Sequence, residues 1–134
     1  MKALPQVTGP TENALRALLN RQLTSSRIPD YLAWVCLNFS AGSGSRATLE
    51  AMLDAETKCG PEAATAAVEQ LVAFGLLVND GHPTPDGQAE LAAVRRRVQI
   101  TTAKLVAGVS EQDIATTILV LDHVRERAEA LLED

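Results

Sequence analysis

The sequence predicts a mainly α-helical protein, and three observations carry this prediction. Aromatic residues make up only 3% of the chain and hydrophobic residues 46%, so aliphatic side chains and alanines must fill the core, which favours closely packed helices over a sheet. Apolar residues recur at helical spacings of three and four along several stretches. Glycines, prolines and capping residues separate those stretches. The 134 residues predict one domain with a single core, over residues 1–134.

The first predicted helix covers residues 11–22, after a loose leader that ends at Gly9-Pro10. Thr11 is its expected N-cap, and Glu12 lies near the positive end of the helix. The second helix is expected to open at Pro29, with Asp30 in its first turn. Its predicted buried stripe is Ile28, Leu32, Val35, Cys36 and Phe39.

Residues 46–82 predict two short helices, a strand and a tight turn. Ser45 is the expected N-cap of a helix over 46–55, and a second helix follows over 61–74. Gly60 and Pro61 suit the turn and the first helical position between them, and Gly75 suits the end of the second helix. The predicted buried residues are Leu49, Met52, Leu53, Ala64, Val68, Leu71 and Val72.

The order of these elements indicates a winged helix-turn-helix over residues 28–82. Leu76-Leu77-Val78 is predicted to form the short buried strand, and residues 79–82 form the turn of the wing. The fold class expected is therefore mainly α, with a short β wing.

Two long helices are predicted after the wing. Thr84 can cap the first, which keeps one apolar face from Leu91 to Leu105 and stops at Gly108. Ser110-Glu-Gln-Asp113 is predicted to form a capping box at the start of the second long helix. The apolar stripe of that helix is Ile114, Ile118, Leu121, Val124, Ala128, Leu131 and Leu132. A small winged helix cannot cover both stripes, so residues 11–22 and 85–132 are predicted to be dimerisation helices of a homodimer.

Charge and composition exclude several functions. The net charge of −5 offers no global attraction to nucleic acid or anionic lipid, so any phosphate contact must be local. The chain contains neither an apolar run of membrane-spanning length nor the apolar core of a signal peptide, which predicts a cytoplasmic protein without membrane contact. No catalytic constellation, cofactor motif or metal-ligand spacing is present, so neither an enzyme nor a metal site is expected.

The order of parts from Thr11 to Leu132 resembles the multiple antibiotic resistance regulator (MarR) family of bacterial transcription factors. Leu71-Val-Ala-Phe-Gly-Leu-Leu77 is similar to the family's LE-x-x-GLV run, and Thr84-Pro-Asp-Gly87 to its LTP-x-G element. The tail from Gly108 to Leu121 resembles the family's last helix. The resemblance implies a homodimeric regulator that binds double-stranded DNA and responds to a small lipophilic effector.

The resemblance also implies a set of site residues. Residues 61–74 would form the recognition helix in a major groove, and residues 79–82 the wing. The DNA-contacting residues expected on this basis are Arg46, Lys58, Glu62, Thr65, Ala66, Gln70 and His82. A ligand between the winged helix and the long helices would be lined by Trp34, Leu37 and Phe39.

The sequence departs from the family at the DNA-facing positions. The outward positions of the recognition helix hold no Arg or Lys and include Glu62 and Glu69, and carboxylates repel a polyanion. The wing reads Asp80-Gly81-His82, without the family's Asp-x-Arg. Thr65 and Gln70 remain candidate base contacts. An alternative is therefore a degenerate winged-helix dimer that binds a protein or a ligand without reading DNA.

Two further features have competing interpretations. The cluster Arg95-Arg96-Arg97 is expected to be solvated or to pair with Glu90 and Asp86, and a phosphate contact is the alternative. Cys36 lies on an apolar stripe, where a thiol is usually inert. Cys59, next to Lys58, is the better candidate for a redox switch, and a structural role is favoured for it.

Overall fold

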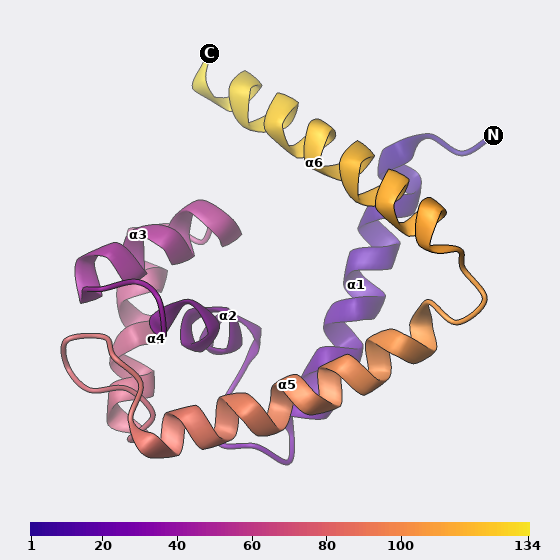
Figure 1. The fold of residues 1–134 in the computed structure, drawn as a ribbon. Coiled ribbons are helices and arrows are strands. Elements are labelled where there is room, and N and C mark those ends of the chain that lie inside the picture. The colour runs from indigo at the N-terminus through magenta and orange to yellow at the C-terminus, as the bar shows by residue number, and fades with distance from the viewer. The chain divides into compact units, whose positions relative to one another are not determined.

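The computed structural model describes all residues from 1 to 134 and contains six helices (Figure 1). They are α1 (Leu4–Leu23), α2 (Tyr31–Ser40), α3 (Arg46–Thr57), α4 (Pro61–Ala73), α5 (Pro85–Leu105) and α6 (Glu111–Glu133). The chain divides into two compact units, residues 1–99 and residues 100–134, and the division lies within α5. The mainly helical fold class is thereby confirmed. None of the six helices combines the length and the hydropathy that a membrane-spanning segment requires.

The core of the first unit lies among α2, α3 and α4, which pack on one another. Aliphatic side chains fill it, as the low aromatic content predicts. Its fully enclosed members include Leu37, Leu49, Leu53, Val68, Leu71, Leu76 and Val94. Helix α2 packs against both α3 and α4, the helix-turn-helix pair, and the outer face of α4 stays exposed.

Helix α1 begins earlier than the sequence predicts. Gly9 and Pro10 do not form a leader, because both lie inside the helix, and Thr11 is not its N-cap. The Thr11 hydroxyl instead donates to the carbonyl of Val7, at 2.6 Å. A proline removes one backbone hydrogen bond, and here that loss does not end the helix.

The helix starts of α2 and α3 depend on side-chain caps. Asp30 lies before the first turn of α2 rather than in it, and its carboxylate accepts the N–H of Ala33 at 2.9 Å. Ser45 is confirmed as the N-cap of α3, where its hydroxyl accepts the N–H of Thr48 at 3.1 Å. These caps satisfy N–H groups that the helices leave open.

The predicted β wing is wrong in one respect: Leu76-Leu77-Val78 forms no strand. A single antiparallel bridge joins Leu77 to Pro83, and the Val78 N–H donates to the His82 carbonyl at 2.8 Å. On the other side of this bridge, the Thr84 N–H donates to the Leu76 carbonyl at 3.1 Å. The ladder does not continue beyond these two hydrogen bonds, because α4 ends and α5 begins on one side and the loop turns at residues 79–81 on the other. The wing is therefore a bridged loop.

Helix α5 starts against the end of α4. The Thr84 hydroxyl donates to the carbonyl of Gly75 at 2.6 Å and accepts the N–H of Gly87 at 3.0 Å, so its capping role is confirmed. Gly75 ends α4 in the left-handed region, at φ 76°. A Cβ on Gly87 would lie 2.0 Å from the carbonyl oxygen of Leu76. Only glycine permits this approach of α5 to the wing base.

The second unit consists of the last turns of α5, a turn at Gly108 and helix α6. Ser110 caps α6 as predicted, with its hydroxyl accepting the N–H of Asp113 at 3.1 Å. No residue of α6 is buried. Its exposed large apolar residues are Ile118, Leu119, Val120, Leu121, Val124, Leu131 and Leu132. Five of these, Ile118, Leu121, Val124, Leu131 and Leu132, belong to the predicted apolar stripe, which is therefore exposed.

Candidate nucleic-acid interface

Helix α4 presents the outer surface of the helix-turn-helix. Its inner face is buried through Ala64, Ala67, Val68 and Leu71. On its outer face a shallow hollow of about 350 Å³ is lined by Pro61, Glu62, Thr65, Ala66 and Glu69. Spacings of three and four place these five residues on one side of the helix. The small side chain of Ala66 would let another surface approach closely.

Arg46 connects the start of α3 to α4 and to the wing. Its Nη2 lies 3.5 Å from Glu69 Oε1, and its Nε lies 3.7 Å from Glu50 Oε2. Its Nη1 donates to the side-chain oxygen of Asn79 at 3.2 Å. The guanidinium is thus shared among three acceptor groups, and its side chain is only 25% exposed. Arg46 holds the helix-turn-helix and the wing together.

The wing rests on the backbone of Arg46. A Cβ on Gly81 would lie 3.0 Å from the Arg46 Cα, and Gly81 adopts φ 95°, a conformation that side chains rarely allow. At the wing tip, His82 Nδ1 lies 2.8 Å from Asp80 Oδ1. Hydrogen bonds from the His82 side chain and backbone lower the pKa of Asp80 from 3.8. The wing therefore presents a carboxylate that is ionised at neutral pH.

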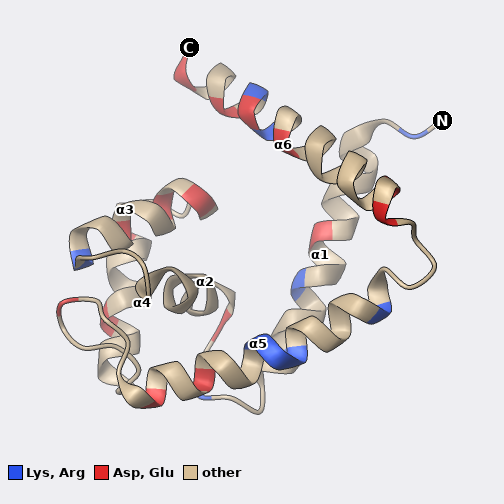
Figure 2. Cartoon of the chain, viewed as in Figure 1, with Lys and Arg blue, Asp and Glu red and all other residues tan.

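Helix α4 and the wing carry carboxylates and no lysine or arginine (Figure 2). Glu62, Glu69 and Asp80 are exposed on α4 and the wing. The cations nearby are engaged: Arg46 contacts carboxylates, and the Lys58 ammonium donates to the carbonyl of Ala55. Contacts to phosphate would therefore require side chains to exchange partners.

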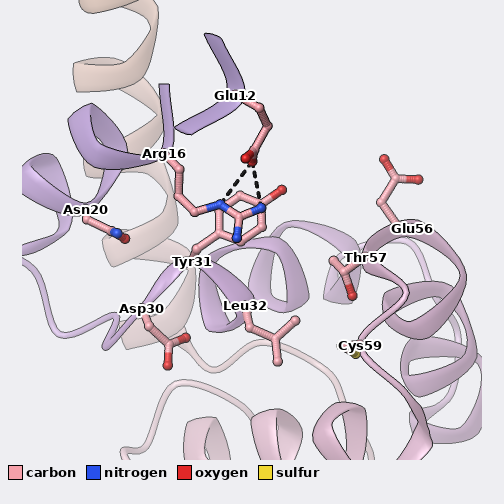
Figure 3. A pocket seen from close by; sticks show the side chains of 9 residues that line it. All are labelled: Glu12, Arg16, Asn20, Asp30, Tyr31, Leu32, Glu56, Thr57 and Cys59. Atoms are coloured by element: carbon pink, nitrogen blue, oxygen red, sulfur yellow. Dashed lines mark hydrogen bonds and ion pairs between the residues drawn. The ribbon is translucent and has the colours of Figure 1, made fainter. Parts of the chain in front are cut away.

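A separate pocket of about 580 Å³ opens between α1, the start of α2 and the end of α3 (Figure 3). The Arg16 guanidinium lies over the Tyr31 ring, 4.3 Å from its centroid, and contacts Glu12 at 2.6 Å. The other lining residues are Asn20, Asp30, Leu32, Glu56, Thr57 and Cys59. Three carboxylates and one guanidinium give the lining a net negative charge.

Several solved structures with this arrangement of helices are MarR family proteins. A MarR family transcriptional regulator from Listeria monocytogenes, complexed with 26mer DNA, matches with a TM-score of 0.78 and 20% identity, over 95% of this chain and 89% of that chain. A Mycobacterium tuberculosis MarR family protein complexed with DNA matches with a TM-score of 0.72 and 17% identity, over 92% of this chain and 98% of that chain. The fold is that of the MarR regulators.

The same Mycobacterium tuberculosis protein complexed with salicylic acid matches the MarR fold of this chain with a TM-score of 0.70 and 17% identity, again over 92% and 98% of the two chains. No protein-family profile matches the sequence, and no curated protein matches it. The MarR fold is therefore recognised through the arrangement of helices, with identities of 16–20% in the structures compared.

Within the MarR fold, the predicted DNA-contacting residues fall into two groups. Glu62, Thr65, Ala66 and Gln70 lie on α4, and all but the half-buried Thr65 are exposed. Arg46, Lys58 and His82 lie at the start of α3, at its end and in the wing. The structure brings Arg46 to Glu69 and Asn79, which the prediction left out of the site. Those contacts join residues far apart in the sequence, so local sequence patterns do not predict them.

The residues predicted to line a ligand site lie on α2. Leu37 is fully buried and belongs to the core, while Trp34 and Phe39 are half-buried against it. None of the three line the pockets on α1–α3, on α4, or between the wing and α5. The ligand site on these three residues stays a prediction.

The carboxylates expected to pair with the arginine cluster have another partner. Asp86 pairs with Arg27 at 3.1 Å, and the Arg27 backbone N–H donates to Glu90 at 3.3 Å. In the cluster, Arg95 donates to Asn38 at 2.9 Å, and Arg97 donates to the Gln22 carbonyl at 3.2 Å. These two arginines tie α5 to α2 and α1. The predicted pairing with Asp86 and Glu90 is therefore wrong.

The two cysteines differ in burial. Cys36 is fully buried, and desolvation, followed by the negative charges of Glu50 and Cys59, raises its pKa to about 12. Cys59 is half-buried and lines the pocket beside α1. The inert role predicted for Cys36 agrees with this environment, since the thiolate is the reactive form.

We expect folding stability to fall between pH 9 and about 12 because of Cys36. In this window the unfolded chain ionises the thiol while the folded chain keeps it neutral, so unfolding gains up to about 1.4 kcal/mol per pH unit. Urea titrations at several pH values would measure this loss. The Cys36→Ala variant, although less stable overall, should show a correspondingly flatter profile. Equal slopes for the two proteins would contradict the assignment.

Proposed function

We propose that the chain is a cytoplasmic, homodimeric transcriptional regulator of the MarR type that binds double-stranded DNA, and that it is not an enzyme. The observation that supports this most is the exposed outer face of α4 in a MarR fold. Two structures with that fold, at TM-scores of 0.72 and 0.78, are complexes with DNA. In this proposal α4 enters the major groove and the wing lies over the neighbouring backbone.

The uncovered apolar stripe of α6 supports the dimer. Monomeric proteins rarely expose apolar surface of this extent, and a second copy could cover it. The exposed Leu4, Val7 and Leu15 of α1 add apolar surface to the other unit. Two copies would place two recognition helices on successive major grooves of a pseudo-palindromic site.

We also propose that a small lipophilic effector modulates the regulator. The salicylic acid complex of the Mycobacterium tuberculosis protein supports an effector of this class. Such a ligand can shift the dimer between DNA-binding and non-binding arrangements only through different affinities for the two. The residues proposed to line its site are Trp34, Leu37 and Phe39.

Titration onto the DNA upstream of the chain's own coding region tests the proposed function. We expect a specific site to bind tightly, with log K falling linearly as log salt rises. Gln70→Ala should weaken binding to that site more than binding to competitor DNA, because a contact with a base depends on the DNA sequence. Fluorescence anisotropy at low and moderate salt measures both effects.

The acidic outer face supports a second candidate, a winged-helix dimer that binds a protein or a ligand without reading DNA. Glu62, Glu69 and Asp80 would repel phosphates and attract a basic partner. Equally weak binding to every DNA in the titration would favour this candidate over the regulator.

A further inference from the structure

The outer face of α4 carries two carboxylates in different surroundings. Glu69 lies 3.5 Å from the Arg46 guanidinium, and its side chain is 65% exposed. Glu62 is also exposed and forms no hydrogen bond or ion pair. One carboxylate is neutralised by a neighbouring cation, and the other is not. The two carboxylates would therefore act differently in a complex with DNA.

Position along the helix separates them further. Glu62 lies in the first turn of α4, and Glu69 lies two turns later, beside α3 and the wing. In helix-turn-helix docking, the first residues of the recognition helix reach the base edges. Glu62 borders the hollow formed with Thr65 and Ala66, so a base edge could approach its carboxylate.

The chemistry of the major groove limits what Glu62 can accept. A carboxylate that enters the groove without a cation must find a hydrogen-bond donor to offset its repulsion from phosphates. The cytosine N4 amino group offers a donor without the adjoining N7 acceptor that adenine presents beside its amino group. Glutamate accepts from cytosine N4 in known base contacts, whereas glutamine pairs with adenine.

We propose that Glu62 reads one cytosine in each half-site by accepting a hydrogen bond from the N4 amino group, while Glu69 holds Arg46 and reads no base. This inference rests on the proposed function, because it assumes that α4 enters a major groove. It deepens that function by assigning opposite effects to two glutamates on the same helix face.

The role of Glu69 follows from the contacts of Arg46. Glu50, Glu69 and Asn79 share its guanidinium, so a phosphate must compete with them. Neutralising Glu69 would leave Arg46 freer to contact a phosphate. Phosphate contacts position a protein without reading sequence, so the gain should be the same for every DNA.

Selection from randomised duplex DNA, followed by sequencing, tests the two roles with a matched pair of variants, Glu62→Gln and Glu69→Gln. Each removes one negative charge and keeps the side-chain length. The wild-type chain should enrich a site with a cytosine at one position of each half. Glu62→Gln should change that position to adenine, with the affinity ratio of cytosine to adenine sites falling about tenfold or more.

Glu69→Gln should keep the cytosine and bind all duplexes more tightly. Its salt dependence should steepen by about 0.9 in log K against log salt, the value for one added phosphate contact. Arg46→Ala in the Glu69→Gln background should abolish that gain. Circular dichroism melting of each variant checks that the fold is retained.

Two results would overturn the inference while leaving the proposed function in place. One is a Glu62→Gln variant that binds every sequence more tightly and still selects cytosine, which would make Glu62 a source of repulsion only. The other is a change of the same base by both glutamine variants. Failure of the wild-type chain to enrich any site would instead contradict the proposed function, and this inference with it.

Discussion

Gly87→Ala should destabilise the folded chain by about 3 kcal/mol or more, the upper range for forcing a group into packed structure. The new Cβ would lie 2.0 Å from the Leu76 carbonyl oxygen, which is backbone and has no rotamer to adopt. The start of α5 would have to move away from the wing base and from the cap at Thr84. Urea unfolding followed by circular dichroism measures the loss.

Gly9→Ala is the matched control for that substitution. Gly9 lies inside α1, and a Cβ built on it would meet no atom within 4 Å apart from its chain neighbours and the backbone of its own helix. Alanine there should change the stability by no more than about 1 kcal/mol, because its better helix propensity opposes the crowding of its Cβ against the ring of Pro10. A Gly87→Ala variant as stable as the wild type would show that α5 does not approach Leu76 as described.

Leu121→Glu should convert the proposed dimer into a monomer at micromolar concentration. Leu121 lies on the apolar stripe of α6 and is 42% exposed in the single chain. A carboxylate at a covered interface would lose its hydration without gaining a partner, a cost of several kcal/mol. The dimer dissociation constant should rise at least a hundredfold, or about 3 kcal/mol.

Sedimentation velocity over a range of concentrations measures the change. His123→Glu adds a carboxylate two residues away on the same helix, on a side that points away from Leu121, and should leave the dimer intact. Leu121→Glu should also weaken DNA binding, because the recognition helix of a monomer binds one half-site alone. A wild-type chain that sediments as a monomer would contradict the proposed assembly.

Local patterns in the sequence predicted the helices and most of their ends. Ser45, Thr84 and Ser110 cap helices as their residue types indicate, and Gly75 ends α4. These features depend on neighbours within a few residues. The sequence mispredicts the start of α1 for the same reason, since Gly9-Pro10 is a local signal of a helix break that the rest of the helix overrides.

The contacts that define the candidate site could not be predicted in this way. Arg46 meets Asn79 across 33 residues, and the pairing of Arg27 with Asp86 spans 59. Both depend on how helices pack, which a single sequence shows only through its apolar stripes. The outward positions of α4 were predictable, because the stripe that buries Val68 and Leu71 leaves the opposite side to solvent.

The bridge between Leu77 and Pro83 makes the wing a suitable place for loop grafting. The base is already closed by that bridge, so residues added at the exposed Asp80 would extend outward without entering the core. Lengthening a loop by a few residues costs little closure entropy. An arginine carried on such an extension would give the protein the cation that its own wing lacks.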